Sequence, residues 1–308
     1  MINKIKAVMF GHAVADAMGV PVEFLSRQQL KNNPVADMMG YGTYNMPEGC
    51  WSDDTSMALC ELESLSKNQI NYDDIMQNFV KWAIDQQFTP TGVVFDIGNT
   101  TREAIGKYHF DNMPIEKCGA TDEFSNGNGS LMRMHPFVLY AYAKNINDND
   151  FDNMIKSASA LTHAHQYSID GCMIYSYILR ELLLNASRNS VYAGIEKVKY
   201  KLNTSRHIYS RVLDNDISIY SEEEIKSTGY VVDSLEAALW CLMTTKNYAQ
   251  CILKAINLGG DTDTIGAIAG SLAGALYGLD LIPEKWIKTL KKLDYIEKMC
   301  EDAWFAWQ

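Results

Sequence analysis

Apolar residues recur at three- and four-residue steps along most of the chain, which is the periodicity of an amphipathic α-helix. Strand-like alternation is nearly absent, and the one ambiguous run is Tyr230 to Val232. The pattern therefore predicts an all-α fold with loops at the proline- and glycine-rich stretches. The predicted helices span 2–18, 54–66, 72–86, 100–107, 131–144, 151–161, 168–186, 190–202, 232–244, 247–256, 264–278 and 284–292.

The stretch from Leu202 to Gly229 departs from this pattern because it is polar and irregular. We expect residues 202–229 to form a long connection or insertion. No shift in composition and no fixed-period repeat marks a second domain. The sequence thus predicts one domain over residues 1–308.

A stripe of glycines marks one predicted helix, since Gly266, Gly270, Gly274 and Gly278 recur at every fourth position. A glycine inside a helix costs about 1 kcal/mol relative to alanine. We expect the stripe to persist because another helix or loop backbone approaches closely along it. This helix is therefore predicted to lie at the centre of the fold.

Charge and cysteine content narrow the class of protein. The formal net charge of −11 disfavours generic binding to nucleic acid or to anionic membrane surfaces. Seven scattered cysteines predict neither a disulfide framework nor a thiolate metal site. His12 and Asp16 interrupt the N-terminal apolar stretch, which argues against a secretory signal. We therefore expect a cytoplasmic protein, with the uncharged segment 265–279 serving as a core helix.

Two acidic clusters each precede a predicted helix, namely Ser52-Asp53-Asp54-Thr55 and Asp261-Thr262-Asp263-Thr264. One interpretation is helix capping, because Ser, Thr and Asp are favoured at helix N-termini. Capping leaves a surplus of carboxylates across the two clusters. The other interpretation is a metal site, because Mg²⁺ binds hard oxygen ligands from carboxylates, hydroxyls and water. Spacing alone does not bring such distant residues together, so both interpretations stay open.

A third segment with chemical potential is the glycine-rich run from Ser125 to Ser130. A glycine-rich turn that leads into a helix exposes backbone N–H groups and can hold a phosphate, although Asn-Gly repeats also simply make turns. His163 and His165 lie between two predicted helices and do not share a helix face. We expect them to hydrogen-bond at a loop rather than to bind zinc.

Together these segments resemble the ADP-ribosylglycohydrolase family. They occur in family order along nearly the whole chain, with Pro21 and Glu23 following the first of them. Each motif alone is weak, but seven in order are specific. The matching segments are GHAVADAMG (11–19), WSDDT (51–55), FDIGNTT (95–101), GNGSLMR (127–133), TH (162–163), GYVVDSL (229–235) and NLGGDTDT (257–264).

The resemblance implies an orthogonal all-α bundle with a binuclear magnesium or manganese site. It implies catalytic roles for Asp54, Asp96 and Glu23. Glu23 would lie beside the metals and help to gate the site, and Asp96 would face the scissile bond. The general base stays open between Asp54 and Asp96. The implied metal ligands are Ser52, Asp53, Asp54, Asp261, Asp263 and Thr264.

The resemblance also implies how a substrate would bind. The glycine-rich loop would hold the diphosphate and the nearby ribose, His163 would touch the distal ribose, and Tyr230 would line the cleft. The implied substrate-binding residues are Glu23, Asp96, Ser125, Asn126, Gly127, Asn128, Gly129, His163, Tyr230, Gly259 and Gly260.

The implied function is metal-dependent hydrolysis of the C1″ glycosidic bond, which releases ADP-ribose from a modified protein. Mono-ADP-ribosylated arginine is the expected substrate, because Asp96 can pair with a guanidinium through two parallel hydrogen bonds. The cofactors would be two Mg²⁺ or Mn²⁺ ions, and a monomer is expected. Three alternatives stay open: hydrolysis of a serine-linked, polymeric or nucleic-acid-linked ADP-ribose, an immunity protein that neutralises an ADP-ribosylating toxin by binding it, and a non-catalytic crystallin-like relative.

Overall fold

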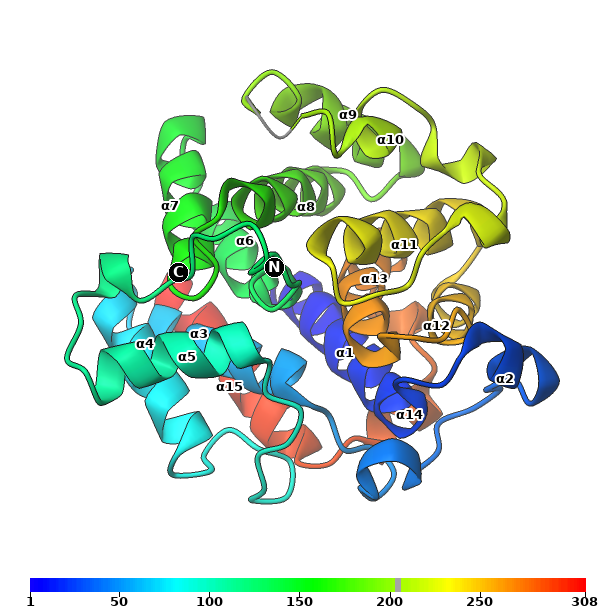
Figure 1. The fold of residues 1–308 in the computed structure, drawn as a ribbon, viewed down its shortest axis with the longest axis horizontal. Helices are drawn as coiled ribbons and strands as arrows, with labels where there is room; N and C mark the ends of the chain where they lie inside the picture. The colour runs from blue at the N-terminus through cyan, green and yellow to red at the C-terminus, as the bar shows by residue number, and fades with distance from the viewer. Residues whose placement is uncertain (203–205) are drawn as a thin grey trace.

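The structure is a computed structural model that describes residues 1–202 and 206–308. Over the described residues the fold is helical and no β-strand forms. Single β-bridges join Tyr41 to Met46, Ala120 to His163 and Gly127 to Tyr230. The all-α prediction is therefore confirmed. Helices cross at steep angles, as α7 and α8 do in Figure 1, which is the arrangement of an orthogonal bundle.

The α-helices are α1 Ile2–Gly19, α2 Arg27–Asn32, α3 Asp53–Leu65, α4 Tyr72–Ala83, α5 Asn99–His109, α6 His135–Ala143, α7 Asp148–Ala160, α8 Gln166–Leu184, α9 Arg188–Val198, α10 Ser210–Leu213, α11 Val231–Thr244, α12 Tyr248–Ile256, α13 Thr262–Tyr277, α14 Glu284–Thr289 and α15 Leu293–Trp307. Short 3₁₀ turns are η1 Val20–Val22, η2 Gly42–Tyr44, η3 Ile115–Lys117, η4 Leu131–Arg133, η5 Ile217–Ile219, η6 Glu222–Glu224 and η7 Leu279–Leu281.

Several predicted elements differ from the structure. The ambiguous strand is wrong, because Val231 begins α11 and Tyr230 forms only one bridge. The helix predicted over 131–144 is two elements, since Pro136 suits the first turn of a new helix better than a helix interior. The helix predicted over 284–292 ends at Thr289. The sequence analysis missed α2, α10 and α15.

Helix α1 runs through the centre of the molecule, with other helices on every side (Figure 1). Every residue from Ala7 to Gly19 is buried. A helix that is apolar all round its circumference needs partners all round, and α1 contacts α3, α6, α12, α13, α14 and α15. Asp16, a buried acid on this helix, is consequently held inside the protein.

Helix α13 packs along α1 more extensively than any other pair of helices packs. A Cβ at Gly270 would lie 2.1 Å from the carbonyl oxygen of Gly11, and one at Gly274 would lie 2.0 Å from that of Ala7. The expectation of close backbone approach is therefore confirmed for these positions and for Gly266, whose Cβ would lie 3.0 Å from the Ala15 oxygen. It is wrong for Gly278, which follows the helix with φ +86° and has nothing nearby.

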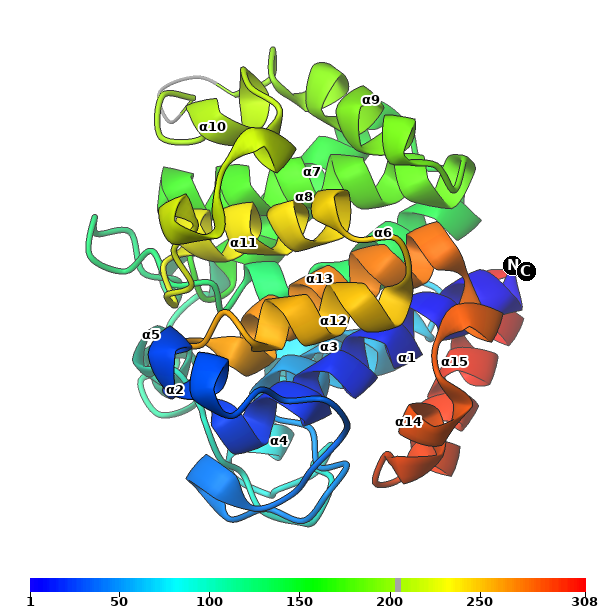
Figure 2. The same cartoon turned by 90° about the vertical axis from the view of Figure 1, so that its right-hand side faces the viewer.

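The remaining helices pack around α1 and α13. Helices α11 and α12 lie along α13, α8 packs on α7 and α9, and α3 packs on α4, α6 and α15 (Figure 2). The buried hydrophobic residues form one continuous cluster from Ile5 to Trp307. The bounds of the predicted domain, 1–308, stay a prediction.

The segment predicted as an irregular connection contains structure of its own, in α10, η5 and η6; residues 203–205 lie outside the described residues. Tyr209, Val212 and Ile217 from this segment are buried in the core cluster. Arg27 of α2 ties it down by donating hydrogen bonds to the carbonyl oxygens of Glu222 and Ile225. The segment is thus an integrated part of the described fold.

One segment, Ile2–Val22, is long and apolar enough to cross a membrane by length and composition. Its most apolar window is 94% buried inside the protein, as expected for the core helix just described. All seven cysteines are buried and free.

Candidate functional site

The first acidic cluster lies at the start of α3, where Ser52 is the N-cap residue and Asp16 of α1 accepts further N–H groups. Asp16 of α1 accepts hydrogen bonds from the backbone N–H of Ser52 at 2.9 Å and of Thr55 at 3.1 Å, and from the Thr55 hydroxyl at 2.6 Å. The Ser52 hydroxyl accepts the Asp54 N–H at 3.3 Å. Because Asp16 and Ser52 satisfy the helix N-terminus, the carboxylates of Asp53 and Asp54 are left over.

The second cluster lies at the start of α13. Here the Asp263 Oδ1 atom accepts the Thr264 N–H at 2.9 Å, and the Asp261 Oδ2 atom accepts the Asn128 amide at 2.8 Å. Asp261, the N-cap residue, makes no side-chain capping hydrogen bond. Capping therefore uses one carboxylate oxygen of this cluster and not the others.

The two helix starts meet in space although they lie far apart in sequence. The Thr264 hydroxyl donates a hydrogen bond to Asp54 Oδ2 over 3.2 Å. Gly19, at the end of α1, permits this approach, because a Cβ at Gly19 would lie 2.3 Å from the Cα of Asp263. The juxtaposition on which a shared metal site depends is present.

Four carboxylate oxygens at this junction are buried without a hydrogen-bond partner among the described residues. They are Glu23 Oε2, Asp54 Oδ1, Asp261 Oδ1 and Asp263 Oδ2. A buried polar oxygen without a partner is costly, and buried charges are normally paired or bound to metal. Hard carboxylate oxygens with hydroxyls nearby are the ligand set that Mg²⁺ and Mn²⁺ prefer. The donor set therefore fits divalent cations.

The pKa values of these acids also favour a bound cation. Burial, then repulsion from Asp96, raises the pKa of Glu23 to about 9. Burial also raises the pKa values of Asp53 and Asp54 well above their usual range, followed by repulsion from Asp96 for Asp53 and from Asp16 for Asp54. For Asp263, burial is followed by repulsion from Glu23. So many acids cannot all ionise together without added positive charge.

The protein supplies little of that charge. Of the described residues that line the cleft, none is lysine or arginine. Burial lowers the pKa of His163 to about 3, so this histidine is neutral at physiological pH. Arg133, which lies nearby, is buried and paired with Glu61. A bound cation is the natural counter-charge.

Asp96 joins two of these acids in a tight group. Carboxylate oxygens of Glu23, Asp96 and Asp263 all lie within 4.8 Å of one another. The Tyr44 hydroxyl donates to Asp96 Oδ1 over 2.5 Å. The sequence analysis did not identify Tyr44, because nothing in the local pattern marks a tyrosine in a turn as a partner for a distant acid.

These groups border a cleft of about 230 Å³. Nine of the predicted site residues line it: Glu23, Asp53, Asp96, Gly127, Asn128, Gly129, His163, Asp261 and Thr264. The other lining residues, which the predicted site set omitted, are Gly98, Asn99, Thr100, Thr101, Met132 and Gly229. Gly98 to Thr101 form the start of α5, whose N-cap glycine has no side chain to cap the first N–H groups of the helix.

His163 is oriented by a chain of buried hydrogen bonds. The Arg133 guanidinium donates to the Thr162 hydroxyl at 3.0 Å, and this hydroxyl lies 2.8 Å from His163 Nδ1. Because Nδ1 is the acceptor available to the Thr162 proton, we assign the histidine proton to Nε2. That nitrogen lies beside Gly127 and Gly129, where a Cβ at Gly129 would meet the imidazole at 2.9 Å. His163 thus hydrogen-bonds to Thr162, and His165 hydrogen-bonds to Asn126 of the glycine-rich loop, in line with the expected hydrogen-bonding role.

Other predicted residues lie around the cleft without lining it. Ser52, Asp54 and Asp263 are buried beneath its floor. Ser125 and Asn126 belong to the loop above it, where Ser125 binds Asp122 and Asn126 binds Ser168. Tyr230 is 37% exposed and bridges to Gly127.

Gly259 and Gly260 form a turn behind the start of α13. Both have positive φ, and a Cβ at Gly260 would lie 2.1 Å from the Ser227 carbonyl oxygen. Their glycine identity is explained by this packing. The roles of the predicted site residues in substrate binding stay predictions.

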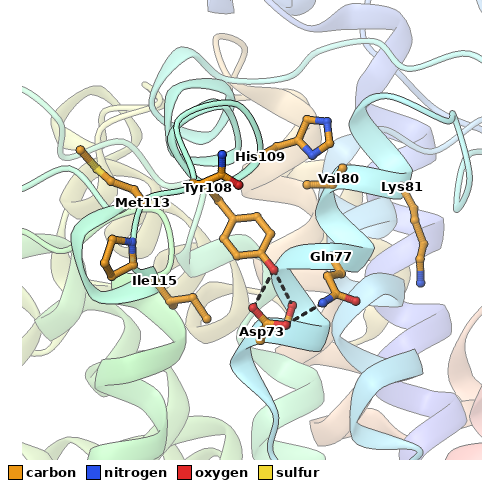
Figure 3. A pocket seen from close by; sticks show the side chains of 10 residues that line it. Asp73, Gln77, Val80, Lys81, Tyr108, His109, Met113 and Ile115 are labelled. Carbon is orange, nitrogen blue, oxygen red and sulfur yellow. Dashed lines mark hydrogen bonds between the residues drawn. The ribbon is translucent and has the colours of Figure 1, made fainter.

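A larger groove of about 650 Å³ lies elsewhere, between α4 and α5 (Figure 3). Its Asp73 carboxylate already accepts hydrogen bonds from Tyr108 at 2.7 Å and Gln77 at 2.6 Å. No group of acids with unpartnered oxygens borders it among the described residues. The smaller cleft is therefore the better candidate for chemistry.

Comparison with known proteins shows a family relationship over the whole chain. The sequence matches the ADP-ribosylglycohydrolase family over residues 1–308. An ADP-ribosylarginine hydrolase of Serratia proteamaculans is 33% identical over 314 residues, which cover 99% of this chain and 80% of the relative. An ADP-ribosyl-[dinitrogen reductase] glycohydrolase of Rhodospirillum rubrum is 28% identical over 283 residues, covering 91% and 87%.

A solved structure of an ADP-ribosylglycohydrolase-related protein complex superposes with a TM-score of 0.84 at 30% identity, covering 100% of this chain and 99% of the other. Sequence and fold thus agree over the full length of the chain. This protein belongs to the ADP-ribosylglycohydrolase family.

Proposed function

We propose that this protein is a divalent-metal-dependent hydrolase that releases ADP-ribose from mono-ADP-ribosylated arginine in proteins. The observation that carries the proposal is a set of four unpartnered, buried carboxylate oxygens beside the cleft. Three belong to the starts of α3 and α13, and the fourth is from Glu23. Relatives named ADP-ribosylarginine hydrolase, at 33% and 31% identity, support the arginine linkage.

Asp53, Asp54, Asp261 and Asp263, with the hydroxyls of Ser52 and Thr264, would hold two cations. When bound, Mg²⁺ or Mn²⁺ would supply the positive charge that grips ribose hydroxyls and orients water for attack. The N–H groups at the start of α5 and in the loop at Gly127 would face the diphosphate, because residues of both elements line the cleft.

The remaining acids act on the bond that breaks. Cleavage of the C1″ glycosidic bond develops positive charge on the ribose, and the carboxylates of Glu23 and Asp96 border the cleft where that charge would form. Asp96 would accept two parallel hydrogen bonds from the guanidinium leaving group. Asp54 and Asp96 are the candidates for the general base.

The test is release of ADP-ribose from a peptide that carries ADP-ribosyl-arginine, in Mg²⁺, in Mn²⁺ and in EDTA. We expect turnover with either metal and almost none in EDTA. A matched peptide with ADP-ribosyl-serine reports the linkage. Equal turnover in EDTA would refute the metal requirement, and cleavage of the serine peptide alone would refute the arginine linkage.

A further inference from the structure

We propose that Tyr44 is a positioning residue that fixes the carboxylate plane of Asp96 and thereby favours a guanidinium leaving group over an alcohol. This inference rests on the proposed function, because it assigns Asp96 to the acceptor side of the cleaved bond. It concerns a residue that touches Asp96 and not the reacting atoms.

The loop that carries Asp96 has little support from its own backbone. No backbone N–H of the described residues from 88 to 98 donates to a backbone carbonyl oxygen. The side-chain hydrogen bonds of Thr89, to the Gln86 carbonyl oxygen and from the Gly92 N–H, lie several residues before Asp96. Asp96 itself has φ +57°, a left-handed conformation that non-glycine residues seldom adopt. The orientation of its side chain must therefore be set by a neighbouring side chain.

Tyr44 is the neighbour that does this. Its hydroxyl donates to Asp96 Oδ1 over 2.5 Å, and its ring packs on Phe95 with the ring centroids 5.1 Å apart. Burial, then the nearby Asp96, raises the pKa of Tyr44, so the phenol keeps its proton and remains a donor.

The turn that carries Tyr44 is firmly held, in contrast to the loop of Asp96. The Tyr41 N–H donates to the Met46 carbonyl oxygen over 2.5 Å, and the Thr43 hydroxyl donates to the Glu23 carbonyl oxygen over 2.8 Å. Gly42, with φ +66°, lies against the Pro21 carbonyl oxygen, where a Cβ would be 1.9 Å away. The hydrogen bond from Tyr44 thus holds Asp96, which lies on a loop with few backbone hydrogen bonds, against a firmly held turn.

The chemistry of the leaving group explains why this matters. A carboxylate oxygen accepts two hydrogen bonds, so Oδ1 of Asp96 can bind Tyr44 and still face a substrate. A guanidinium donates through a planar fork and needs the carboxylate in its own plane. An alcohol oxygen makes a single hydrogen bond and tolerates rotation of the carboxylate. Loss of the Tyr44 hydroxyl should therefore impair arginine cleavage more than serine cleavage.

The experiment compares Tyr44→Phe with Tyr41→Phe in the full-length protein loaded with Mg²⁺. Tyr41 lies in the same turn, is 61% exposed and makes no side-chain hydrogen bond among the described residues, so its variant is the matched control. We expect Tyr44→Phe to lower kcat for the arginine peptide by roughly 10- to 100-fold, the range for losing a hydrogen bond to a charged group. Tyr41→Phe should match the wild type, and any residual serine cleavage should change less than arginine cleavage.

One readout does not depend on turnover, since Mg²⁺ affinity by calorimetry should be equal in both variants. An active wild type with equal arginine kcat for both variants would overturn this inference alone, as would an equal fold-loss of arginine and serine cleavage in Tyr44→Phe. A wild type that releases no ADP-ribose from any peptide would overturn the proposed function, and this inference with it.

Discussion

Two helix starts fixed in the core form one part of the cleft, the core wall. Loops form another part, the loop wall, where single side-chain hydrogen bonds orient Asp96 and His163. The core wall places Asp54 and Asp263 through the backbone contact of α1 with α13 and the capping of α3 by Asp16. The loop wall places Asp96 through Tyr44 and His163 through Thr162. The groups expected to bind metal are thus set by packing, and those expected to meet the substrate are set by individual hydrogen bonds.

Removing an acid from the core wall should have the largest effect. We expect Asp263→Asn to lower turnover by roughly 10²- to 10³-fold or more and to abolish tight Mg²⁺ binding, since it removes a buried ligand oxygen. Steady-state kinetics and calorimetry measure both quantities. Asp294→Asn, an exposed acid in the first turn of α15, is the control for loss of a helix-dipole partner. Comparable activity in the two variants would indicate that Asp263 caps the helix and does not bind metal.

The packing that holds the core wall can be tested separately. Gly270→Ala would place a methyl group against the Gly11 carbonyl oxygen, and we expect it to lower the free energy of unfolding by about 1–3 kcal/mol. The control is Gly106→Ala in α5, where nothing lies within 4 Å of the added Cβ. This variant should gain up to about 1 kcal/mol from helix propensity. Urea denaturation distinguishes the two, and equal effects would contradict the close-packing account.

Metal removal tests whether the core wall needs a counter-charge. Without metal, the pKa of Glu23 is about 9 in the folded protein and near 4.5 in the unfolded chain, so the folded state binds more protons between these pH values. The free energy of unfolding should therefore fall as pH rises from 5 towards 9. Mg²⁺ at about 100 times its Kd should add about 2.7 kcal/mol and flatten the slope. Thermal melts in EDTA and in Mg²⁺ across this range measure both effects; identical curves would argue against a metal site.

The loop wall should respond more weakly. Thr162→Val removes the hydroxyl that orients His163, and we expect the Kd for ADP-ribose to rise by about 5- to 10-fold, as for one lost hydrogen bond. Thr162→Ser keeps the hydroxyl and should bind like the wild type. Calorimetry with ADP-ribose provides the measurement. Weakening in Thr162→Ser alone would show that the Thr162 methyl group, not its hydroxyl, matters.

Local sequence patterns predicted much of the fold but not the contacts between residues that lie far apart in the sequence. Periodicity placed most helices, and the glycine stripe anticipated the contact of α13 with α1. Helix α15 was missed although Ile296, Met299, Cys300 and Ala303 follow helical spacing, so its signal was present in the sequence. Residues 202–229 were predicted to be irregular because their buried residues occur in short runs that are separated from one another.

The same distinction between local patterns and long-range contacts holds for the residues of the site. Both acidic clusters were legible, but the choice between capping and metal binding depended on Asp16, which caps α3 from another helix. Tyr44 meets Asp96 across 52 positions of sequence, and no local pattern encodes such a pair. Residues with a fixed local spacing could be predicted, and residues that act by reaching across the fold could not.

Gly19 does not line the cleft, yet the backbone of Asp263 occupies the place that a side chain at position 19 would fill. The separation of the two acid-bearing helix starts is therefore set by a missing methyl group. Mg²⁺ requires oxygen ligands at about 2.0–2.1 Å, whereas Ca²⁺ accepts about 2.3–2.6 Å. We expect ion-size selectivity in this protein to depend on a glycine that never touches an ion.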